Sequence, residues 1–329
     1  MPTRKVKRMR VRKLFAAAVI LIIGIVIGLP AMVSWLMPDR IKAVGTVVRM
    51  YSHKDNKIHS IPLEEYLVGV VAAEMPGEFP EEALKAQAVA ARTYVLKRLQ
   101  GGGVSNSTHP GADVCDDHRH SQAWISREEM KKRWGLVKYY RCYHKIKKAV
   151  ADTTGMVITY DGSLIDPVYH SSCGGVGTEN SEDVWKFEVP YLRSATCPYE
   201  DPNKSKRTVE ISLAGIGEKL GVDLTALPVS TGSSLFTVVE KTETGRPRLI
   251  KIGEKEIPAV ELRNLLGLRS TSFTWQPAGD KLKITTTGYG HGVGMCQYGA
   301  KGFAEQGKDF EEILTHYYKG VKIVRLKDS

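Results

Sequence analysis

One glutamate interrupts an apolar helical stripe. The segment 63–74 has apolar residues at positions 63, 66, 67, 70 and 71, which is the spacing of an amphipathic helix. The next position of the stripe is Glu74, so a carboxyl group is predicted on the buried face at the C-terminal end of the helix. Burial and the negative end of the helix dipole both favour the protonated form, which a general acid needs. The alternative is a solvated side chain at a fraying helix end.

Two basic residues lie seven positions apart in the next predicted helix, which is dense in alanine over 81–94. Lys85 and Arg92 are about 20° apart around the helix axis and point to the same side. Two cations on a tightly packed helix could bind anionic or hydroxylated groups of a substrate. The alternative is a solvated basic face.

Glycine alternates with other residues over 288–294. In an extended chain, this pattern removes the side chains from one face, so that a ligand or another backbone can approach closely. Tyr289 and His291 would point to the opposite face. The run matches neither the dinucleotide-binding nor the P-loop spacing, so these two ligand classes are excluded here. Close packing of a helix on a strand is the alternative reading.

A polar loop contains a possible zinc site formed by His109, Cys115, His118 and His120. Imidazole and thiolate groups are preferred zinc ligands. The alternative is a polar loop without a metal.

The elements that position these residues mix helices and strands without regular alternation, which predicts the α+β class. We expect mainly antiparallel strands with packed helices around a substrate cleft. A strand over 43–52 is expected to pair with 57–61 as a hairpin. Helices are expected after Pro62 and after Pro80, and near 259–266, 296–306 and 310–318. A strand is expected over 282–295, running into the glycine run. Residues 205–270 are expected to form a smaller subdomain.

The N-terminal region predicts a membrane anchor. Seven of the first 13 residues are basic and none is acidic, and they account for seven of the net charge of +11. A nucleic-acid-binding function therefore loses its main support. The segment 14–36 has no charged residue and is long enough to span a bilayer. The basic tip predicts that the N-terminus stays inside and that the following chain lies outside. The alternatives are a cleaved signal peptide, although no small-x-small site follows, and a buried soluble helix.

Several motifs together resemble the stage II sporulation protein D family, which consists of membrane-anchored peptidoglycan lytic transglycosylases of endospore-forming bacteria. The resemblance extends over about 44–325, and the motifs that carry it are Val71–Pro76, Glu82–Tyr94, Ser171–Leu192 and Gly290–Ala300. It implies that Glu74 is the catalytic acid. It also implies a set of substrate-binding residues: Lys85, Gln87, Arg92, Ser171, Ser172, Tyr191, His291, Gln297 and Tyr298.

The resemblance further implies cleavage of glycan strands, preferably strands without stem peptides, during forespore engulfment. In this reaction the 6-hydroxyl group of muramic acid attacks its own anomeric carbon and gives a 1,6-anhydro end. A single acid suffices and no cofactor is required, whereas hydrolytic glycosidases usually need two carboxyl groups. The implied partners are an amidase (sporulation protein P) and a membrane scaffold (sporulation protein M).

The resemblance also bears on the zinc site. Some relatives hold a structural zinc in the corresponding loop, and His109, Cys115 and His120 match three of its ligands. Ser121 stands where the fourth ligand would be a cysteine, so His118, Asp116 or Asp117 would have to replace it.

Two other functional classes remain open: a non-catalytic wall-binding module that enhances an amidase, and a metal-dependent hydrolase. The five cysteines are an odd number, so at least one is unpaired or a metal binds some of them. Cys173 and Cys197 could pair, but the sequence does not determine the connectivity. Neither Cys173 nor Cys296 has neighbours typical of a thiol nucleophile, which favours a packing role.

Overall fold

The structure is a computed structural model of the 329-residue chain. It describes residues 45–101, 109–117, 120–222, 224 and 236–326. The basic tip 1–13 and the predicted membrane anchor 14–36 lie outside these ranges. Within them, no helix is both long enough and apolar enough to cross a membrane.

The described chain begins with the hairpin that the sequence predicts. Strand β1 (Val47–Ser52) pairs antiparallel with β2 (Lys57–Pro62), and β3 (Val114–Cys115) adds to β1 in parallel. Helix α3 (Leu63–Glu74) follows directly after Pro62 and has two acidic residues in its first turn, where the helix dipole favours them. All five apolar positions of the predicted stripe are buried.

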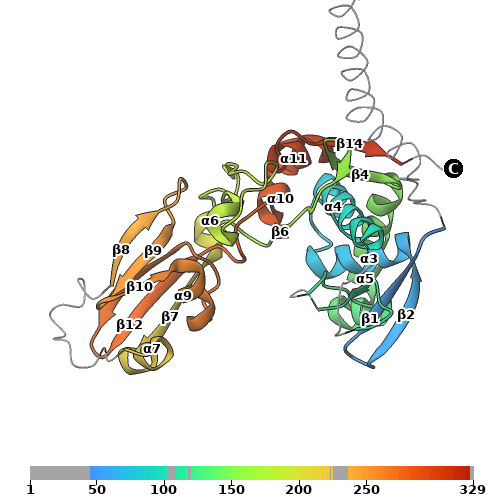
Figure 1. Ribbon diagram of the computed structural model, residues 1–329. Helices are drawn as coiled ribbons and strands as arrows, with labels where there is room; N and C mark the ends of the chain where they lie inside the picture. Colours follow the sequence, from blue (N-terminus) through green and yellow to red (C-terminus); the bar gives the residue numbers. More distant parts are fainter. Residues whose placement is uncertain (1–44, 102–108, 118–119, 223, 225–235, 327–329) are drawn as a thin grey trace, which may run out of the picture. The chain divides into compact units, whose positions relative to one another are not determined.

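Helix α4 (Glu81–Gln100) lies at the centre of the structural core (Figure 1). Its alanines at 83, 86, 88, 90 and 91 are fully buried, so neighbouring elements can approach its backbone from several sides. It contacts α3 and four other elements: α5 (Arg127–Asp152), β4 (Met156–Tyr160), α10 (Gln297–Glu305) and α11 (Phe310–Tyr317). The predicted close packing on several sides is confirmed.

Two small sheets connect the second half of the chain to this core. Strand β4 pairs antiparallel with β5 (Ser163–Leu164) and β14 (Lys322–Arg325). Strand β6 (Tyr169–His170) pairs in parallel with β13 (Met295–Cys296). This second pairing brings the segment around residue 170 beside the segment around residue 295.

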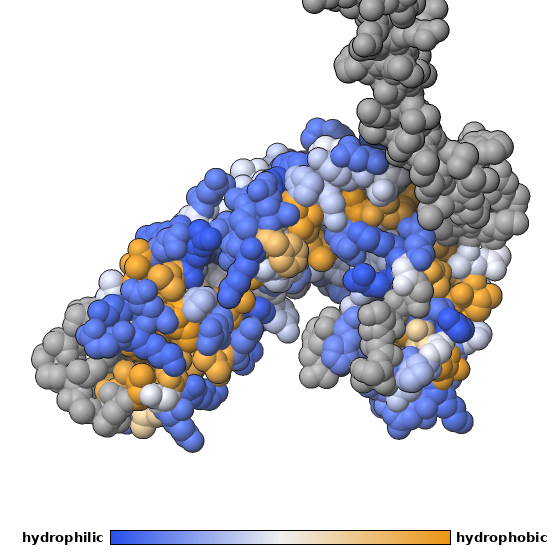
Figure 2. Space-filling view, viewed as in Figure 1, coloured by the Kyte–Doolittle hydropathy of each residue, from blue (hydrophilic) through white to orange (hydrophobic). Residues whose placement is uncertain are grey.

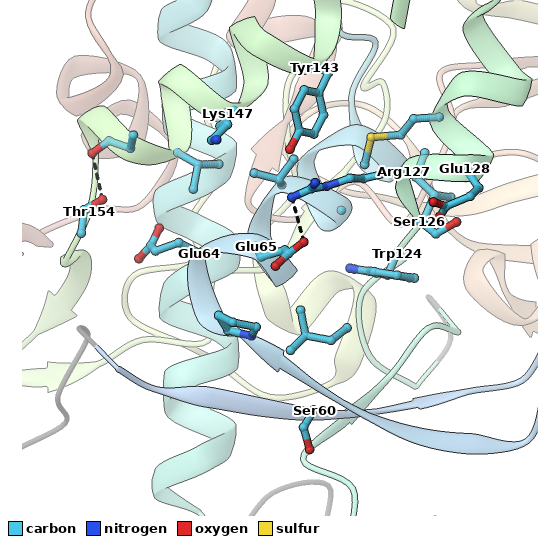
Figure 3. A pocket seen from close by; sticks show the side chains of 18 residues that line it. Ser60, Glu64, Glu65, Trp124, Ser126, Arg127, Glu128, Tyr143, Lys147 and Thr154 are labelled. Atoms are coloured by element: carbon cyan, nitrogen blue, oxygen red, sulfur yellow. Dashed lines mark hydrogen bonds and ion pairs between the residues drawn. The ribbon is translucent and has the colours of Figure 1, made fainter. Parts of the chain in front are cut away.

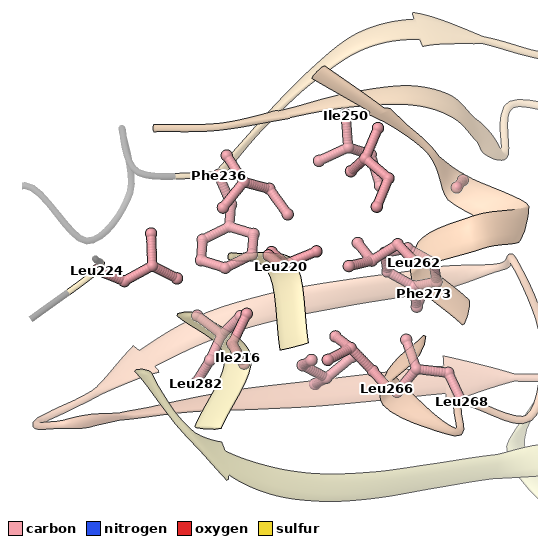
Figure 4. Packing of buried hydrophobic residues seen from close by; sticks show 14 residues of the cluster. Ile216, Leu220, Leu224, Phe236, Ile250, Leu262, Leu266, Leu268, Phe273 and Leu282 are labelled. Carbon is pink, nitrogen blue, oxygen red and sulfur yellow. The ribbon is translucent and has the colours of Figure 1, made fainter. Parts of the chain in front are cut away.

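A second hydrophobic cluster forms between two three-stranded antiparallel sheets (Figure 4). Helix α6 (Ser181–Trp185) and the 3₁₀ helix Pro202–Ser205 precede this unit in the chain. The unit consists of β7 (Lys206–Ser212), α7 (Leu213–Leu220), β8 (Phe236–Lys241), β9 (Pro247–Ile252), β10 (Lys255–Pro258), α9 (Ala259–Leu266), β11 (Phe273–Ala278) and β12 (Lys281–Thr287). Because β12 pairs with both β7 and β11, this unit extends beyond the predicted 205–270.

The whole arrangement is α+β with mainly antiparallel sheets, as predicted. On the face shown in Figure 2, hydrophilic side chains cover much of the surface and hydrophobic ones gather in separate patches.

The glycine run differs from the prediction. Gly288, Gly290, Gly292 and Gly294 all have positive φ angles of 68–119°, so the chain is not an extended strand there and β12 ends at Thr287. A Cβ atom at Gly288 would lie 2.7 Å from the carbonyl oxygen of Ser172, and one at Gly290 would lie 2.7 Å from His170 Cβ. The run is glycine-rich because it turns repeatedly against other parts of this chain.

Candidate active site

Glu74 is the last residue of α3, and its carboxylate is held by two segments far away in the sequence. Its Oε1 accepts a hydrogen bond from the backbone N–H of Ala123 at 3.0 Å. Its Oε2 accepts one from Nε2 of Gln297, the first residue of α10, at 3.3 Å. The side chain is partly buried and not simply solvated. Ala123 contributes through its backbone, so its side chain gives no signal in the sequence.

Two tyrosines, the buried Tyr66 and the half-buried Tyr169, lie close enough to Glu74 to interact with its charge. Gln122 Nε2 donates a hydrogen bond to the Tyr169 hydroxyl at 2.9 Å, and the Tyr66 hydroxyl is 3.4 Å from Gln122 Oε1. Burial raises the pKa of both phenols well above the ordinary value, and the nearby charge of Glu74 adds to the shift. Both phenols are therefore neutral. Sequence reasoning missed Gln122, which orients this cluster from the residue before Ala123.

A pair of amide side chains connects Glu74 to the central helix. Gln297 Nε2 also lies 3.3 Å from Oε1 of Gln87, which is fully buried on α4. Gln87 Nε2 is buried and has no hydrogen-bond partner among the described residues. The structure thus brings Glu74, Gln87 and Gln297 together.

Arg92 is not available to a substrate, contrary to the expectation. Its side chain is fully buried, with Nε and Nη2 donating to the two carboxylate oxygens of Glu64 at 3.1 and 2.6 Å. Other guanidinium N–H groups donate to the carbonyl oxygens of Val150 and Met156 at 3.2 and 3.3 Å. Arg92 is therefore a structural residue that joins α4 to α3 and to the end of α5. The alternative of a solvated basic face is wrong as well.

Lys85 also forms ion pairs within the protein. Its ammonium group lies 2.9 Å from Glu82, 3.4 Å from Glu81 and 3.5 Å from Asp152, and its side chain is only 16 % exposed. Burial opposes the charge, but these carboxylates outweigh it, so the pKa of Lys85 is raised. Glu81, Glu82 and Asp152 therefore already neutralise the charge of Lys85, for which the sequence predicts a role in substrate binding.

His291 supports the backbone of the site. Its Nε2 is 2.9 Å from the carbonyl oxygen of Tyr169, and its Nδ1 accepts a hydrogen bond from the N–H of Val293 at 3.1 Å. Burial lowers the pKa of His291 to about 4, so the imidazole is neutral at physiological pH and donates through Nε2. It is placed to fix the main chain beside the Tyr169 ring.

Tyr298 is the most accessible of the proposed substrate-binding residues. It is 43 % exposed, and its ring packs edge-on against Phe79 with centroids 5.2 Å apart. A cavity of about 500 Å³ is lined by Tyr298, Tyr289, Ser171 and Ser172, among others. The Ser172 hydroxyl donates to Glu200, whereas Ser171 contributes its carbonyl oxygen to the N–H of Tyr298.

Tyr191 contacts a different set of residues. Its hydroxyl accepts a hydrogen bond from the N–H of Asp166 at 3.0 Å, and its ring lies 5.6 Å from that of Tyr160. These contacts join Tyr191 to the segment before β6, and its role in substrate binding stays a prediction.

Another cavity, of about 630 Å³, is not lined by Glu74 (Figure 3). It lies along the N-terminal half of α3, where Arg127 forms an ion pair with Glu65 at 2.9 Å. Trp124 covers Gly69 there and leaves no space for a side chain. Size alone therefore does not identify the site.

The predicted zinc loop provides two ligands, His109 and Cys115, and a third, His53, comes from another segment. Ligand atoms of His53, His109 and Cys115 all lie within 4.8 Å of one another. His53 Nδ1 is bound to Asp116 at 2.6 Å, which leaves Nε2 for a metal. This imidazole and thiolate set suits zinc. Sequence reasoning missed His53, which the β1–β2 turn brings to the loop.

The other proposed ligands do not join this group. His120 is exposed on a turn, where its N–H donates to Asp117, and His118 lies outside the described residues. The ligands that are present would hold a structural ion at the edge of β3.

Comparisons with known proteins bear on the family of this chain. Residues 51–160 match the family model described as "SpoIID: Stage II sporulation protein". The chain is 38 % identical to Stage II sporulation protein D of Bacillus subtilis (strain 168), over 87 % of this chain and 81 % of that protein. It is also 38 % identical to Stage II sporulation protein D of Bacillus amyloliquefaciens, over 84 % of this chain and 78 % of that protein.

A more distant relative has a different name. The chain is 31 % identical to the Amidase enhancer of Bacillus subtilis (strain 168), over 78 % of this chain but only 40 % of that protein. The stage II sporulation proteins match over most of their length at higher identity, and the chain belongs to the stage II sporulation protein D family.

Proposed function

We propose that this protein is a lytic transglycosylase that cleaves peptidoglycan glycan strands outside the membrane during sporulation. The observation that carries the proposal is the carboxyl group of Glu74. It is held by an N–H group of Ala123 and the amide of Gln297, beside two neutral phenols. One positioned carboxyl group is what an intramolecular transglycosylation needs.

In the proposed reaction, Glu74 acts first as an acid and then as a base. Its proton passes to the glycosidic oxygen as the bond from that oxygen to the anomeric carbon of muramic acid breaks. The resulting carboxylate takes the proton from the 6-hydroxyl group, and O6 bonds to the anomeric carbon. The proton returns to Glu74, no water is consumed, and the product carries a 1,6-anhydro ring.

The other groups position the strand and the acid. Gln297 and the N–H of Ala123 stabilise the carboxylate form between the two proton transfers. The exposed rings of Tyr298 and Tyr289 offer apolar faces to sugar rings in the neighbouring cavity. A structural zinc on His53, His109 and Cys115 would stabilise the fold and take no part in the reaction.

We further propose that the segment 14–36 anchors the chain in the membrane with the described region outside. An amidase and a multi-span scaffold are the proposed partners, with strands stripped of stem peptides as the preferred substrate. The anchor rests on the uncharged segment and the basic tip before it, whereas the partners and the substrate preference rest on the family resemblance.

The Glu74→Gln variant tests the proposal. Full-length protein in mild detergent would be incubated with glycan strands lacking stem peptides, and the products would be analysed by mass spectrometry. Wild-type protein should give ends that are lighter by one water than reducing ends. Glu74→Gln is nearly isosteric and should lower the rate by about 10²–10⁴-fold.

The matched control is Glu65→Gln on the same helix, because Glu65 is exposed and pairs with Arg127 away from the site. It should retain wild-type activity. If Glu74→Gln cleaved strands within a few-fold of wild type, the assignment of the acid would be wrong. The other informative outcome is that wild-type protein and Glu74→Gln both fail to cleave strands and yet both increase the activity of an amidase. In that case the name of the 31 % identical relative, Amidase enhancer, would describe the function better.

A further inference from the structure

Three buried cysteines from three separate segments meet in the described structure. Cys173 lies in the loop after β6, Cys197 lies in the loop after α6, and Cys296 ends β13. All three are at most 2 % exposed, and their Sγ atoms lie within 4.8 Å of one another. They share no residue with the His53, His109 and Cys115 group.

A carboxylate lies against this trio. Glu200 Oε2 is 3.1 Å from Cys173 Sγ and 3.2 Å from Cys296 Sγ. Its other oxygen accepts a hydrogen bond from the Ser172 hydroxyl, which fixes the orientation of the group. Glu200 forms no ion pair with a lysine, arginine or histidine of the described chain.

The spacing is close to that of a tetrahedral zinc site. Zinc–sulfur bonds of about 2.3 Å and zinc–oxygen bonds of about 2.1 Å place sulfurs about 3.8 Å apart and sulfur and oxygen about 3.6 Å apart. The three sulfurs lie within 4.8 Å of one another, and Glu200 Oε2 needs to withdraw by about 0.4–0.5 Å from the sulfurs of Cys173 and Cys296 to reach this spacing.

Hydrogen-bond donors surround the sulfurs and would stabilise the negative charge of thiolates. The backbone N–H groups of Cys173 and Gly299 each donate to Cys296 Sγ at 3.2 Å. The Tyr317 hydroxyl lies 3.1 Å from Cys197 Sγ and can donate to it. Donors of this kind orient metal-bound ligands and stabilise their charge.

We propose that Cys173, Cys197, Cys296 and Glu200 bind a structural zinc ion. Three thiolates and one carboxylate are ligands that zinc accepts together in a closed tetrahedral site. Binding replaces the three thiol protons, which pass to solvent, and involves no oxidation or reduction. Because Cys296 directly precedes Gln297, the ion would fix the chain that carries the amide donor to Glu74.

A disulfide is the competing outcome for these thiols. It would join only two of the three sulfurs and would leave the third thiol and Glu200 without a function. It would also require an oxidant.

The experiment uses full-length protein in detergent, reduced, freed of metal by chelation and then loaded with Zn²⁺. The Cys115→Ser background removes a ligand of the other group. In this background, elemental analysis should find one zinc per chain. Adding Cys197→Ser should remove it, whereas adding Cys142→Ser, at a buried cysteine outside both groups, should not.

A second measurement does not depend on the folding of these variants. Wild-type protein loaded with cadmium should show an NMR resonance typical of three sulfur ligands and one oxygen ligand. The absence of that resonance in folded protein would overturn the proposal. So would zinc that remains after Cys197→Ser, or an intact mass lighter by two hydrogens without reductant.

Discussion

Replacing Arg92 by methionine separates a structural role of its guanidinium group from a role in substrate binding. The side chain is fully buried on α4, and two of its nitrogens donate to the Glu64 carboxylate at 3.1 and 2.6 Å. The variant leaves this carboxylate without its cation and the carbonyl oxygens of Val150 and Met156 without their donors.

The expected loss of stability follows from these contacts. Breaking a buried ion pair by removing one partner costs about 3–5 kcal/mol. Glu64 is 33 % exposed and can be rehydrated, which favours the lower end, but the two carbonyl oxygens add about 1 kcal/mol each. We therefore expect a loss of about 3–5 kcal/mol, or a decrease in Tm of about 6–20 °C.

Urea unfolding of the full-length protein in detergent measures this loss, and strand binding is measured on the protein that remains folded. Lys97→Met on the same helix is the matched control, because Lys97 is 32 % exposed and its pair with Asp166 should contribute less than about 1 kcal/mol. Combining Arg92→Met with Glu64→Leu should restore much of the stability, because an apolar pair can replace a buried ion pair. Unchanged unfolding together with weaker strand binding by Arg92→Met would refute the structural role.

Two further variants test the surroundings of Glu74. Gln297→Leu removes the hydrogen bond from Gln297 to the Glu74 carboxylate, which is worth about 1.5–3 kcal/mol. The kcat/KM for strand cleavage should therefore decrease by about 10- to 100-fold. An unchanged kcat/KM would show that this hydrogen bond does not support the reaction. The folded-state pKa of His291 is about 4, below its ordinary 6.5, so its contribution to stability is present above pH 6.5 and is lost as the pH falls towards 4. Between pH 6.5 and 4, the free energy of unfolding should therefore decrease by about 2–3 kcal/mol less in His291→Gln than in wild type. An equal decrease in both proteins would show that His291 is not buried in the neutral form.

Helices α3 and α4 could be predicted from the sequence because the residues that determine each helix lie within it or directly beside it. The apolar stripe of α3, the proline at its start and the alanines of α4 each determine a helix and the face that it buries. Glu74 fell on that stripe, so its position at a buried helix end could be predicted from spacing alone.

The partners of these residues could not be predicted in the same way. Arg92 was expected to point toward a substrate because the sequence gives its direction around the helix but not what lies there. Its carboxylate partner, Glu64, is 28 residues away, and Gln297 is 223 residues from Glu74. Ala123 acts through its backbone, which every residue possesses. Such contacts depend on tertiary packing, and only the family resemblance indicated Gln297 beforehand.

The chain of amides behind Glu74 allows the site to hold either protonation state with the same heavy-atom positions. When Glu74 is ionised, Gln297 donates through Nε2. When Glu74 carries its proton, a half-turn of the Gln297 amide presents Oε1 as the acceptor. Gln87 can make the matching half-turn, because its own Nε2 forms no hydrogen bond within the described chain. The hydrogen-bond direction can thus reverse from Glu74 through Gln297 to Gln87 without any movement of the backbone, which is what the proposed change of Glu74 from acid to base requires.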